Sequence, residues 1–225
     1  MIDFNPLISN FLKRESFPKS VGRYYPSEAG SCVRKSWYSY NIPRQPDVEV
    51  LKVFEMGNLV HGFIVDVLKS EKNPHIKLIS SEDPFQIQKE DFTISGRIDD
   101  VVVVKADNKI YVVEVKSTAS LTYTLQPNES HVYQIQLYMH HKKIKDGIIL
   151  YVEKNTLKTK SFAVSYDEAK LNEAIKRFEL LHKHLKANTL PIPEGRMRKE
   201  MNWQCKTCPY RTECYQATPP SKELS

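Results

Sequence analysis

The sequence predicts an α/β fold of the α+β type, in which helices pack on a mixed sheet and cysteine-bearing arms flank the core. Alternating apolar residues predict two consecutive antiparallel strands, and apolar residues at helical spacing predict helices before and after them. The four cysteines lie towards the two ends of the chain. A chain of 225 residues can form one large domain with extensions. We expect an N-terminal arm over 1–50, a core over 51–190 and a C-terminal cysteine-rich arm over 191–225.

The elements follow from the hydrophobic pattern and from the residues that end each run. A short helix is expected after Ser31, and Pro191 and Pro193 end the last long helix. Asp107 and Asn108 form a hairpin turn between the two central strands. The predicted helices span 54–68, 129–143 and 167–187; the predicted strands span 76–79, 85–88 with a continuation through 92–94, 96–104, 110–116, 148–153 and 158–164.

Composition and charge restrict the function only weakly. The net charge of +6 is compatible with a nucleic-acid partner, although any basic protein would show it. No run approaches the roughly 18 apolar residues of a membrane span, and the first residues lack the pattern of a signal peptide. We therefore expect a cytoplasmic protein with no membrane partner. In that reducing compartment the four cysteines favour metal ligation over disulfides.

The strand at 110–116 carries two charges at the end of an apolar stripe. Because residues two apart share a strand face, Glu114 and Lys116 lie with Ile110 and Val112, opposite Val115. Burying such charges is costly unless they are paired or bind a metal. A structural ion pair between Glu114 and Lys116 is one explanation of this pattern. A cation site is the other.

Carboxylates at the start of the preceding strand favour the cation site. Asp99 and Glu114 on neighbouring strands can share one Mg²⁺ or Mn²⁺ through their oxygens. Lys116 can then polarise an attacking water or neutralise charge on a phosphate. Asp100 is expected to point to the face opposite Asp99 and ranks second as a ligand.

Polar residues on two helices can complete this site. His61 follows Gly57 by one helical turn on a face that should pack inward, so it can give a nitrogen ligand that suits Mn²⁺. A hydrogen-bonded core histidine is the alternative. Gln134 and Tyr138 share a helix face and can bind the cation's water, Lys116 or a nucleotide. A solvated helix face is the alternative for that pair.

The cysteines predict a second centre. Cys205, Cys208 and Cys214 cluster near the C-terminus, and Cys32 lies far upstream. Four thiolates can close one site for zinc or for an iron–sulfur cluster. Such a site would tie the N-terminal arm to the C-terminal arm.

In this order, the motifs resemble those of the PD-(D/E)XK nuclease superfamily in its RecB-like iron–sulfur branch, and specifically the CRISPR-associated exonuclease family, the fourth of the associated-protein series. Ile98 precedes Asp99 where the superfamily name has Pro, as is usual in that branch. The motifs that carry the resemblance are Ser31-Cys32, Gly57-x-x-x-His61, Gly96-Arg97-Ile98-Asp99, Glu114-Val115-Lys116, Gln134-x-x-x-Tyr138 and the triplet Cys205, Cys208 and Cys214.

The resemblance implies specific roles for these residues. The ligands of Mn²⁺ or Mg²⁺ would be His61, Asp99, Glu114 and the Val115 carbonyl, with Lys116 as the catalytic lysine. Gln134 and Tyr138 would lie near the DNA, and a [4Fe–4S] cluster would be held by Cys32, Cys205, Cys208 and Cys214.

The implied activity is a metal-dependent DNA exonuclease that acts mainly on single-stranded DNA in CRISPR spacer acquisition, with CRISPR integration proteins as partners. A viral or mobile-element nuclease of replication and recombination stays open. So does a DNA-end-binding cluster protein with weak nuclease activity. Homo-oligomer formation, cleavage polarity and cluster type are also open.

Overall fold

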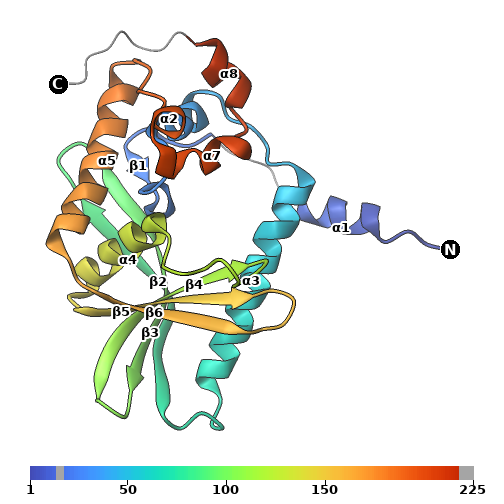
Figure 1. Cartoon of the computed structure of the whole chain (residues 1–225), viewed down its shortest axis with the longest axis vertical. Helices are drawn as coiled ribbons and strands as arrows, with labels where there is room; N and C mark the ends of the chain where they lie inside the picture. The colour runs from blue at the N-terminus through green and yellow to red at the C-terminus, as the bar shows by residue number, and fades with distance from the viewer. Residues whose placement is uncertain (14–17, 218–225) are drawn as a thin grey trace.

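The computed structural model describes residues 1–13 and 18–217, which form a six-stranded sheet between helices (Figure 1). The strands are β1 (Arg23–Tyr24), β2 (Ile76–Gln88), β3 (Thr93–Val104), β4 (Lys109–Thr118), β5 (Asp146–Glu153) and β6 (Thr159–Ser165). The α-helices are α1 (Asn5–Leu12), α2 (Val33–Asn41), α3 (Val48–Lys69), α4 (Glu129–Lys142), α5 (Glu168–Lys186), α6 (Glu194–Met197), α7 (Trp203–Lys206) and α8 (Arg211–Gln216). None of the helices in these ranges is long and apolar enough to cross a membrane.

The sheet is mixed, as the sequence predicts. β3 runs antiparallel to β2 and to β4, β4 runs parallel to β5, and β5 runs antiparallel to β6. The parallel pair is joined through α4, which is the crossover connection that parallel strands need.

β3 and β4 part in the middle of the sheet. Their pairing extends from Val104 opposite Lys109 to Asp100 opposite Val113. On its other edge β4 pairs with β5 from Tyr111 to Thr118, so it continues past the point where it leaves β3. The same edge of β3 meets β1 only at Thr93 and Ile94. The two central strands therefore form a fork that opens at Asp99, and the space between its arms is bordered by polar ends of both strands.

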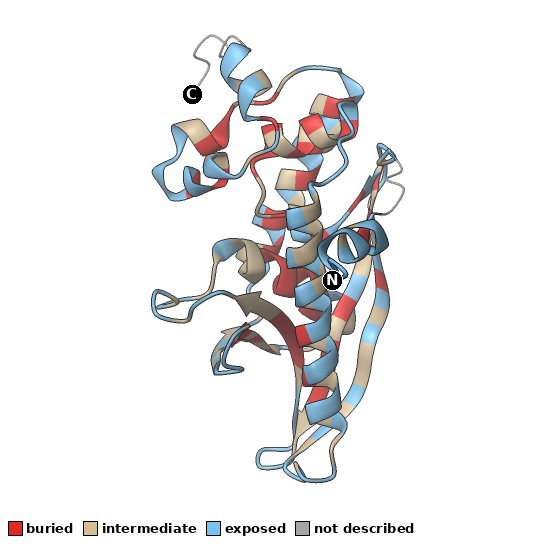
Figure 2. Ribbon diagram, turned by 90° about the vertical axis from the view of Figure 1, so that its right-hand side faces the viewer, coloured by how far each residue is buried: buried red, intermediate tan, exposed pale blue. Residues whose placement is uncertain are grey.

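Helices cover both faces of the sheet. α3 crosses one face, and α4 and α5 lie over the other (Figures 1 and 2). The side chains of β4 alternate as predicted, because Val112 packs in the core of α4 and α5 whereas Val113 and Val115 pack against α3. Glu114 therefore faces α4, in the middle of the protein.

Several elements differ from the sequence prediction. β2 is one strand with a bulge between Leu78 and Ser80. The sequence predicted two short strands here, because the polar run after Ile79 obscures the alternation of the strand. The predicted continuation through 92–94 is wrong: the chain turns at 89–92, where the Lys89 N–H donates to the Phe92 carbonyl at 2.8 Å. α3 begins at Val48, earlier than expected, and α1 was not predicted.

A buried ion pair joins the two arms. The Arg177 guanidinium binds both carboxylate oxygens of Glu194 at 2.9 Å, and it also donates to the carbonyls of Ala29 and Ser31 at 2.6 and 2.7 Å. Glu194 accepts a further hydrogen bond from the Val33 N–H at 2.8 Å. One side chain of α5 thus holds the N-terminal arm against the C-terminal arm.

Gln204 makes a second link between the arms. Its side-chain oxygen accepts from the Cys32 N–H at 2.9 Å, and its nitrogen donates to the Gly30 carbonyl at 2.9 Å. The arms are therefore joined by protein contacts as well as by any group that the cysteines bind.

We predict that Arg177→Ala lowers the free energy of unfolding by about 3 kcal/mol, because the buried Glu194 carboxylate loses its bidentate partner and keeps only the long contact with Arg198 and the Val33 N–H. Urea unfolding measures this change. Lys176→Ala, at an exposed neighbouring position on α5, is the matched control and should change stability by less than about 0.5 kcal/mol. Equal effects of the two substitutions would contradict this role of Arg177.

Candidate active site

Asp99 satisfies a backbone group that the parting of the strands exposes. Because β4 has left β3 at this level, the Val115 N–H has no ladder partner on β3 and instead donates to Asp99 Oδ2 at 2.9 Å. In a strand, the N–H and C=O of one residue point to the same side. The Val115 carbonyl is therefore directed into the fork as well.

Glu114 is fully buried beside Asp99. Lys116 forms an ion pair with its Oε1, so the structural pair that the sequence left open does form. Within the described part of the chain, neither Glu114 oxygen accepts a hydrogen bond of good geometry. Burial, and then the charge of Asp99, raise the pKa of Glu114 to about 8. A buried carboxyl whose oxygens accept no well-formed hydrogen bond is a candidate ligand for a cation.

The three charged groups of the fork influence one another. Burial raises the pKa of Asp99, although Lys116 partly opposes this effect. Burial lowers the pKa of Lys116, but the carboxylates of Glu114 and Asp99 outweigh it and leave the pKa above its usual value. The fork therefore favours added positive charge, and a divalent cation would stabilise both carboxylates in their ionised form.

His61 reaches the site from the other face of the sheet. Its Nε2 lies 3.2 Å from Asp100 Oδ2 and its Nδ1 lies 3.2 Å from Glu82 Oε1. The hydrogen bond with Asp100 raises the pKa of His61 above its usual value. Asp100 pairs with Val113, so it faces α3, opposite Asp99, as predicted.

The shared cation site of His61, Asp99 and Glu114 remains a prediction. Over residues 1–13 and 18–217, no three His, Cys, Asp or Glu side chains are already arranged to hold one metal ion. Burial raises the pKa values of Asp99 and Glu114, and His61 is close enough to both acids for its charge to lower these pKa values in part.

Sequence reasoning missed Glu82. It lies in β2 with a φ of 53° and binds both His61 and Arg97. Glu82 lies in the polar run Ser80-Ser81-Glu82-Asp83, which is typical of a turn or loop. The sequence therefore offered no reason to single it out as a site residue.

Gln134 and Tyr138 face the sheet rather than solvent. Both side chains are buried on α4, and Gln134 Nε2 donates to the Tyr138 hydroxyl at 2.8 Å. Burial, followed by the charges of Glu114 and Asp99, raises the pKa of Tyr138. The alternative of a solvated helix face is therefore wrong, and the Tyr138 hydroxyl lies in the electrostatic environment of the fork.

Tyr151 and His131 extend the site beyond the predicted residues. Tyr151 lies beside Lys116 in the parallel register of β4 and β5. Its hydroxyl is 2.7 Å from His131 Nδ1 and accepts from the Asn128 N–H at 2.9 Å. Burial, and then the charge of Lys116, lower the pKa of His131 to about 3, so its ring is neutral. Sequence spacing gives no signal for this pair, because a parallel register depends on the crossover.

The four cysteines line one cavity between the arms. All four are free thiols, and Cys32 stands immediately before α2 while the other three come from the C-terminal arm. Burial, and then the three other cysteines, raise the pKa of Cys205. The four thiols thus border one cavity, and a shared metal or cluster site for them stays a prediction, since no three of these cysteines are already arranged around one metal position in the described residues.

An unpaired buried charge lies beside this cavity. The Arg34 side chain is fully buried, its Nε donates to the Pro191 carbonyl at 2.5 Å, and its two terminal nitrogens have no hydrogen-bond partner among the described residues. Arg34 also lines the cysteine cavity. Because an unpaired buried guanidinium is costly, this cavity is suited to a group with negative charge.

Comparison with known proteins gives the superfamily of the chain. The sequence matches the PD-(D/E)XK nuclease superfamily over residues 62–215, which is well over half of the chain. The chain belongs to that superfamily. A search of the curated proteins finds no match.

Solved structures share the fold. The crystal structure of SSO0001 has a TM-score of 0.64 at 20% identity, with 94% of this chain and 96% of that chain covered. The alkaline exonuclease LHK-Exo from Laribacter hongkongensis has a TM-score of 0.52 at 11% identity, with 81% of this chain and 95% of that chain covered. At these identities the similarity establishes the architecture.

We predict that Glu114→Gln stabilises the metal-free protein, and increasingly so at higher pH. The pKa of Glu114 rises from 4.5 to about 8 on folding, so between these values the folded state holds a proton that the unfolded chain has lost. Stability therefore falls as pH rises through this window, by at most about 1.4 kcal/mol per pH unit. The substitution removes this loss.

Urea unfolding in chelator at pH 5 and pH 8 measures the difference between wild type and Glu114→Gln. Glu179→Gln, a half-exposed carboxylate on α5, is the control. A stability difference for Glu114→Gln that is the same at both pH values would contradict the account.

Proposed function

We propose that this nuclease is a metal-dependent DNA exonuclease that acts mainly on single strands. The carrying observation is the buried group of Asp99, Glu114 and Lys116 in the fork between β3 and β4. The two carboxyls have raised pKa values, and Lys116 forms an ion pair with Glu114. Such a group is suited to bind a cation and to act on a phosphodiester.

The donor set fits a divalent cation. Asp99, Glu114 and the Val115 carbonyl offer the oxygens that Mg²⁺ and Mn²⁺ prefer, and His61 would add a nitrogen that favours Mn²⁺. A bound cation would lower the pKa of a water molecule and neutralise charge on the phosphate.

The protein side chains perform the remaining steps. Lys116 keeps its positive charge because of its two acidic neighbours, so it can donate a hydrogen bond to the attacking water or to a phosphate oxygen. Burial keeps the Tyr138 hydroxyl protonated, and Gln134 donates to its oxygen, so its own O–H is left to donate towards the acids or the nucleotide. These roles of Gln134 and Tyr138 follow the motif of the branch.

We also propose that Cys32, Cys205, Cys208 and Cys214 hold a [4Fe–4S] cluster. In such a cluster each thiolate binds a different iron, so the sulfurs surround a cavity rather than one ion, and the proposal is supported by the fact that all four cysteines line one cavity. The unpaired Arg34 supports the proposal, because thiolates would supply the missing negative charge. The cluster would add a third link between the arms, beside those of Arg177 and Gln204.

The biological role that we propose is trimming of DNA for CRISPR spacer acquisition, with integration proteins as partners. The support is the unbroken order of motifs from Cys32 to Cys214. A mobile-element nuclease would use the same chemistry on the same site.

We predict that Lys116→Ala lowers the cleavage rate of end-labelled single-stranded DNA in Mn²⁺ by at least about 100-fold, because the phosphate loses its charged hydrogen-bond donor. Lys109→Ala, at the exposed start of the same strand, should retain wild-type activity. Equal cutting by wild type and Lys116→Ala would refute the proposed mechanism. The order in which labelled ends appear reports polarity in the same assay.

We predict that the effect of Arg34→Met reverses sign with cluster loading. Without a cluster, the substitution removes an unpaired buried charge and should raise the free energy of unfolding by about 1 kcal/mol or more. With a cluster, it should shorten the lifetime of the iron–sulfur absorbance in chelator.

Protein purified anaerobically, with iron and sulfide analysis, supplies the loaded state. Lys206→Met on the exposed surface of α7 should change neither quantity. A colourless zinc protein would exclude the cluster assignment. So would a variant Arg34→Met that raises the free energy of unfolding without a cluster and also lengthens the lifetime of the iron–sulfur absorbance with one.

A further inference from the structure

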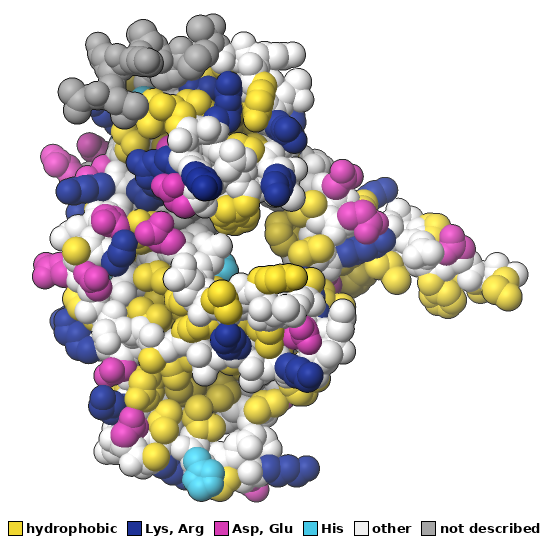
Figure 3. All heavy atoms as spheres, in the orientation of Figure 1, with side chains coloured by type: hydrophobic (Ala, Val, Ile, Leu, Met, Phe, Trp, Pro, Cys, Tyr) yellow, Lys and Arg dark blue, Asp and Glu magenta, His cyan; other side chains and the backbone are white. Residues whose placement is uncertain are grey.

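A polar hollow adjoins the fork on the side of Lys116. It has a volume of about 600 Å³, in the range of small-molecule sites, and lies between the loop at 119–128 and the C-terminal arm. Figure 3 shows the surface open between the C-terminal arm, α3 and this loop, with hydrophobic side chains around the opening. Neither the sequence motifs nor the proposed chemistry uses this space.

The inner wall of the hollow connects it to the active site. Tyr151 and His131 line it, and Tyr151 stands beside Lys116 in the sheet. The Tyr151 hydroxyl accepts from the Asn128 N–H and shares a hydrogen bond with His131 Nδ1, whose direction depends on the tautomer of the ring. The neutral ring offers its second nitrogen, Nε2, to a ligand as a donor or as an acceptor. A nucleotide bound here would lie next to the phosphate at Lys116.

The outer rim of the hollow carries two exposed aromatic side chains. Tyr123 of the loop is 91% exposed and Trp203 of α7 is 51% exposed, and both line the hollow. They come from opposite sides of the opening, one from the sheet side and one from the arm. Flat aromatic faces at such a rim are suited to stack on unpaired bases.

The charges of the hollow favour a base over a run of phosphates. Arg198 lines it with a half-exposed side chain whose ion pair with Glu194 is long, at 3.8 Å, so it can meet one phosphate. Glu129 and Glu200 line it as well, and they would repel a longer stretch of backbone. Aromatic stacking with one or two nucleotides is the contact that this mixture permits.

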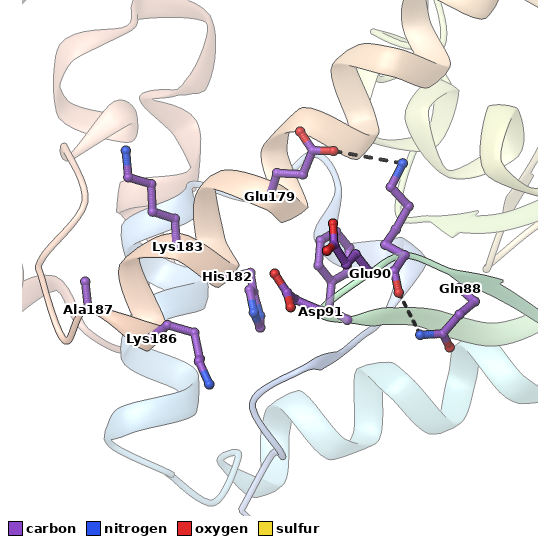
Figure 4. Close-up of a pocket in the computed structure, with 10 residues that line it drawn as sticks. Gln88, Glu90, Asp91, Glu179, His182, Lys183, Lys186 and Ala187 are labelled. Carbon is purple, nitrogen blue, oxygen red and sulfur yellow. Dashed lines mark hydrogen bonds and ion pairs between the residues drawn. The ribbon is translucent and has the colours of Figure 1, made fainter.

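A larger hollow elsewhere does not offer such contacts. It lies between α5 and the turn at 89–92, where acidic and basic side chains alternate (Figure 4). Lys89 already pairs with Glu179 at 4.0 Å, and His182 Nδ1 is 2.7 Å from the Tyr24 hydroxyl. Some of its polar groups are already bound within the protein and its remaining charges are of both signs, so we assign no ligand to it.

We propose that the hollow beside Tyr151 binds the base of a nucleotide adjoining the scissile phosphate, stacked between Tyr123 and Trp203. The proposal rests on the proposed nuclease function and deepens it by naming what selects the substrate. Bases in a duplex are already stacked on one another, so only an unpaired strand can enter without paying for melting. This contact would give the enzyme its preference for single strands.

Fluorescence anisotropy of labelled oligothymidine in chelator tests the proposal without cleavage. Tyr123→Ala with Trp203→Ala should weaken binding roughly 10-fold or more, whereas Tyr123→Phe with Trp203→Phe should retain it. Leu125→Ala is the matched control, because this residue is 81% exposed in the same loop but does not line the hollow. A second oligonucleotide of equal length without bases should bind wild type and the double alanine variant equally.

Two results would overturn the proposal: wild-type affinity of the double alanine variant for oligothymidine, or an equal loss of affinity on the oligonucleotide without bases. Cleavage in Mn²⁺ separates this failure from failure of the nuclease assignment. If the double alanine variant binds like wild type while wild type cuts and Lys116→Ala does not, only the stacking site is lost. If wild type neither cuts nor binds DNA, the proposed function fails and the stacking site fails with it.

Discussion

The chemistry of this protein depends on one backbone requirement, the hydrogen bond of the Val115 N–H. Where β4 leaves β3, this group loses its ladder partner and takes the carboxylate of Asp99 instead. The same parting leaves Glu114 buried against α4, where its oxygens accept no well-formed hydrogen bond from the described residues, and it directs the Val115 carbonyl into the fork. The acids are therefore gathered by the geometry of the sheet, and Lys116 limits their repulsion. The site is costly for folding and is suited to a cation.

The N-terminal and C-terminal arms are far apart in the sequence but pack together as one unit beside the sheet. Arg177, Glu194 and Gln204 fasten the N-terminal and C-terminal arms to α5 and to each other. Arg34 is buried beside the cysteines, and its two terminal nitrogens have no hydrogen-bond partner in the part of the chain that the structure describes, so an anionic group here would balance its charge. A thiolate centre would be such a group. The outer end of the same unit presents Trp203 to the loop of Tyr123, so the arms both stabilise the fold and border the DNA path that we propose.

Period-two and helical patterns predicted the mixed sheet, the long helices and the facing of Glu114, because these depend on local spacing. Motif order predicted the superfamily. The patterns failed where distant contacts decide: β2 was divided because its polar run over 80–83 matches a turn, although β2 pairs with β3 from Ile76 to Gln88. The contact of His61 with Asp100 and Glu82 depends on how α3 crosses the sheet. Tyr151 was missed because its position beside Lys116 arises from a parallel register. Gln134 and Tyr138 were placed on the right helix face, but only the fold shows that this face is buried.

Electron paramagnetic resonance of Mn²⁺ binding to wild type, Asp99→Asn and Asp100→Asn tests the central claim most directly, since it requires no DNA and no turnover. The account predicts that Asp99→Asn abolishes measurable binding, because Asp99 lies in the fork with Glu114. Asp100→Asn should only weaken binding, because Asp100 contacts the cation site through His61 on the opposite face. Unchanged Mn²⁺ affinity in Asp99→Asn, or loss in Asp100→Asn alone, would contradict the assignment of the fork as the metal site.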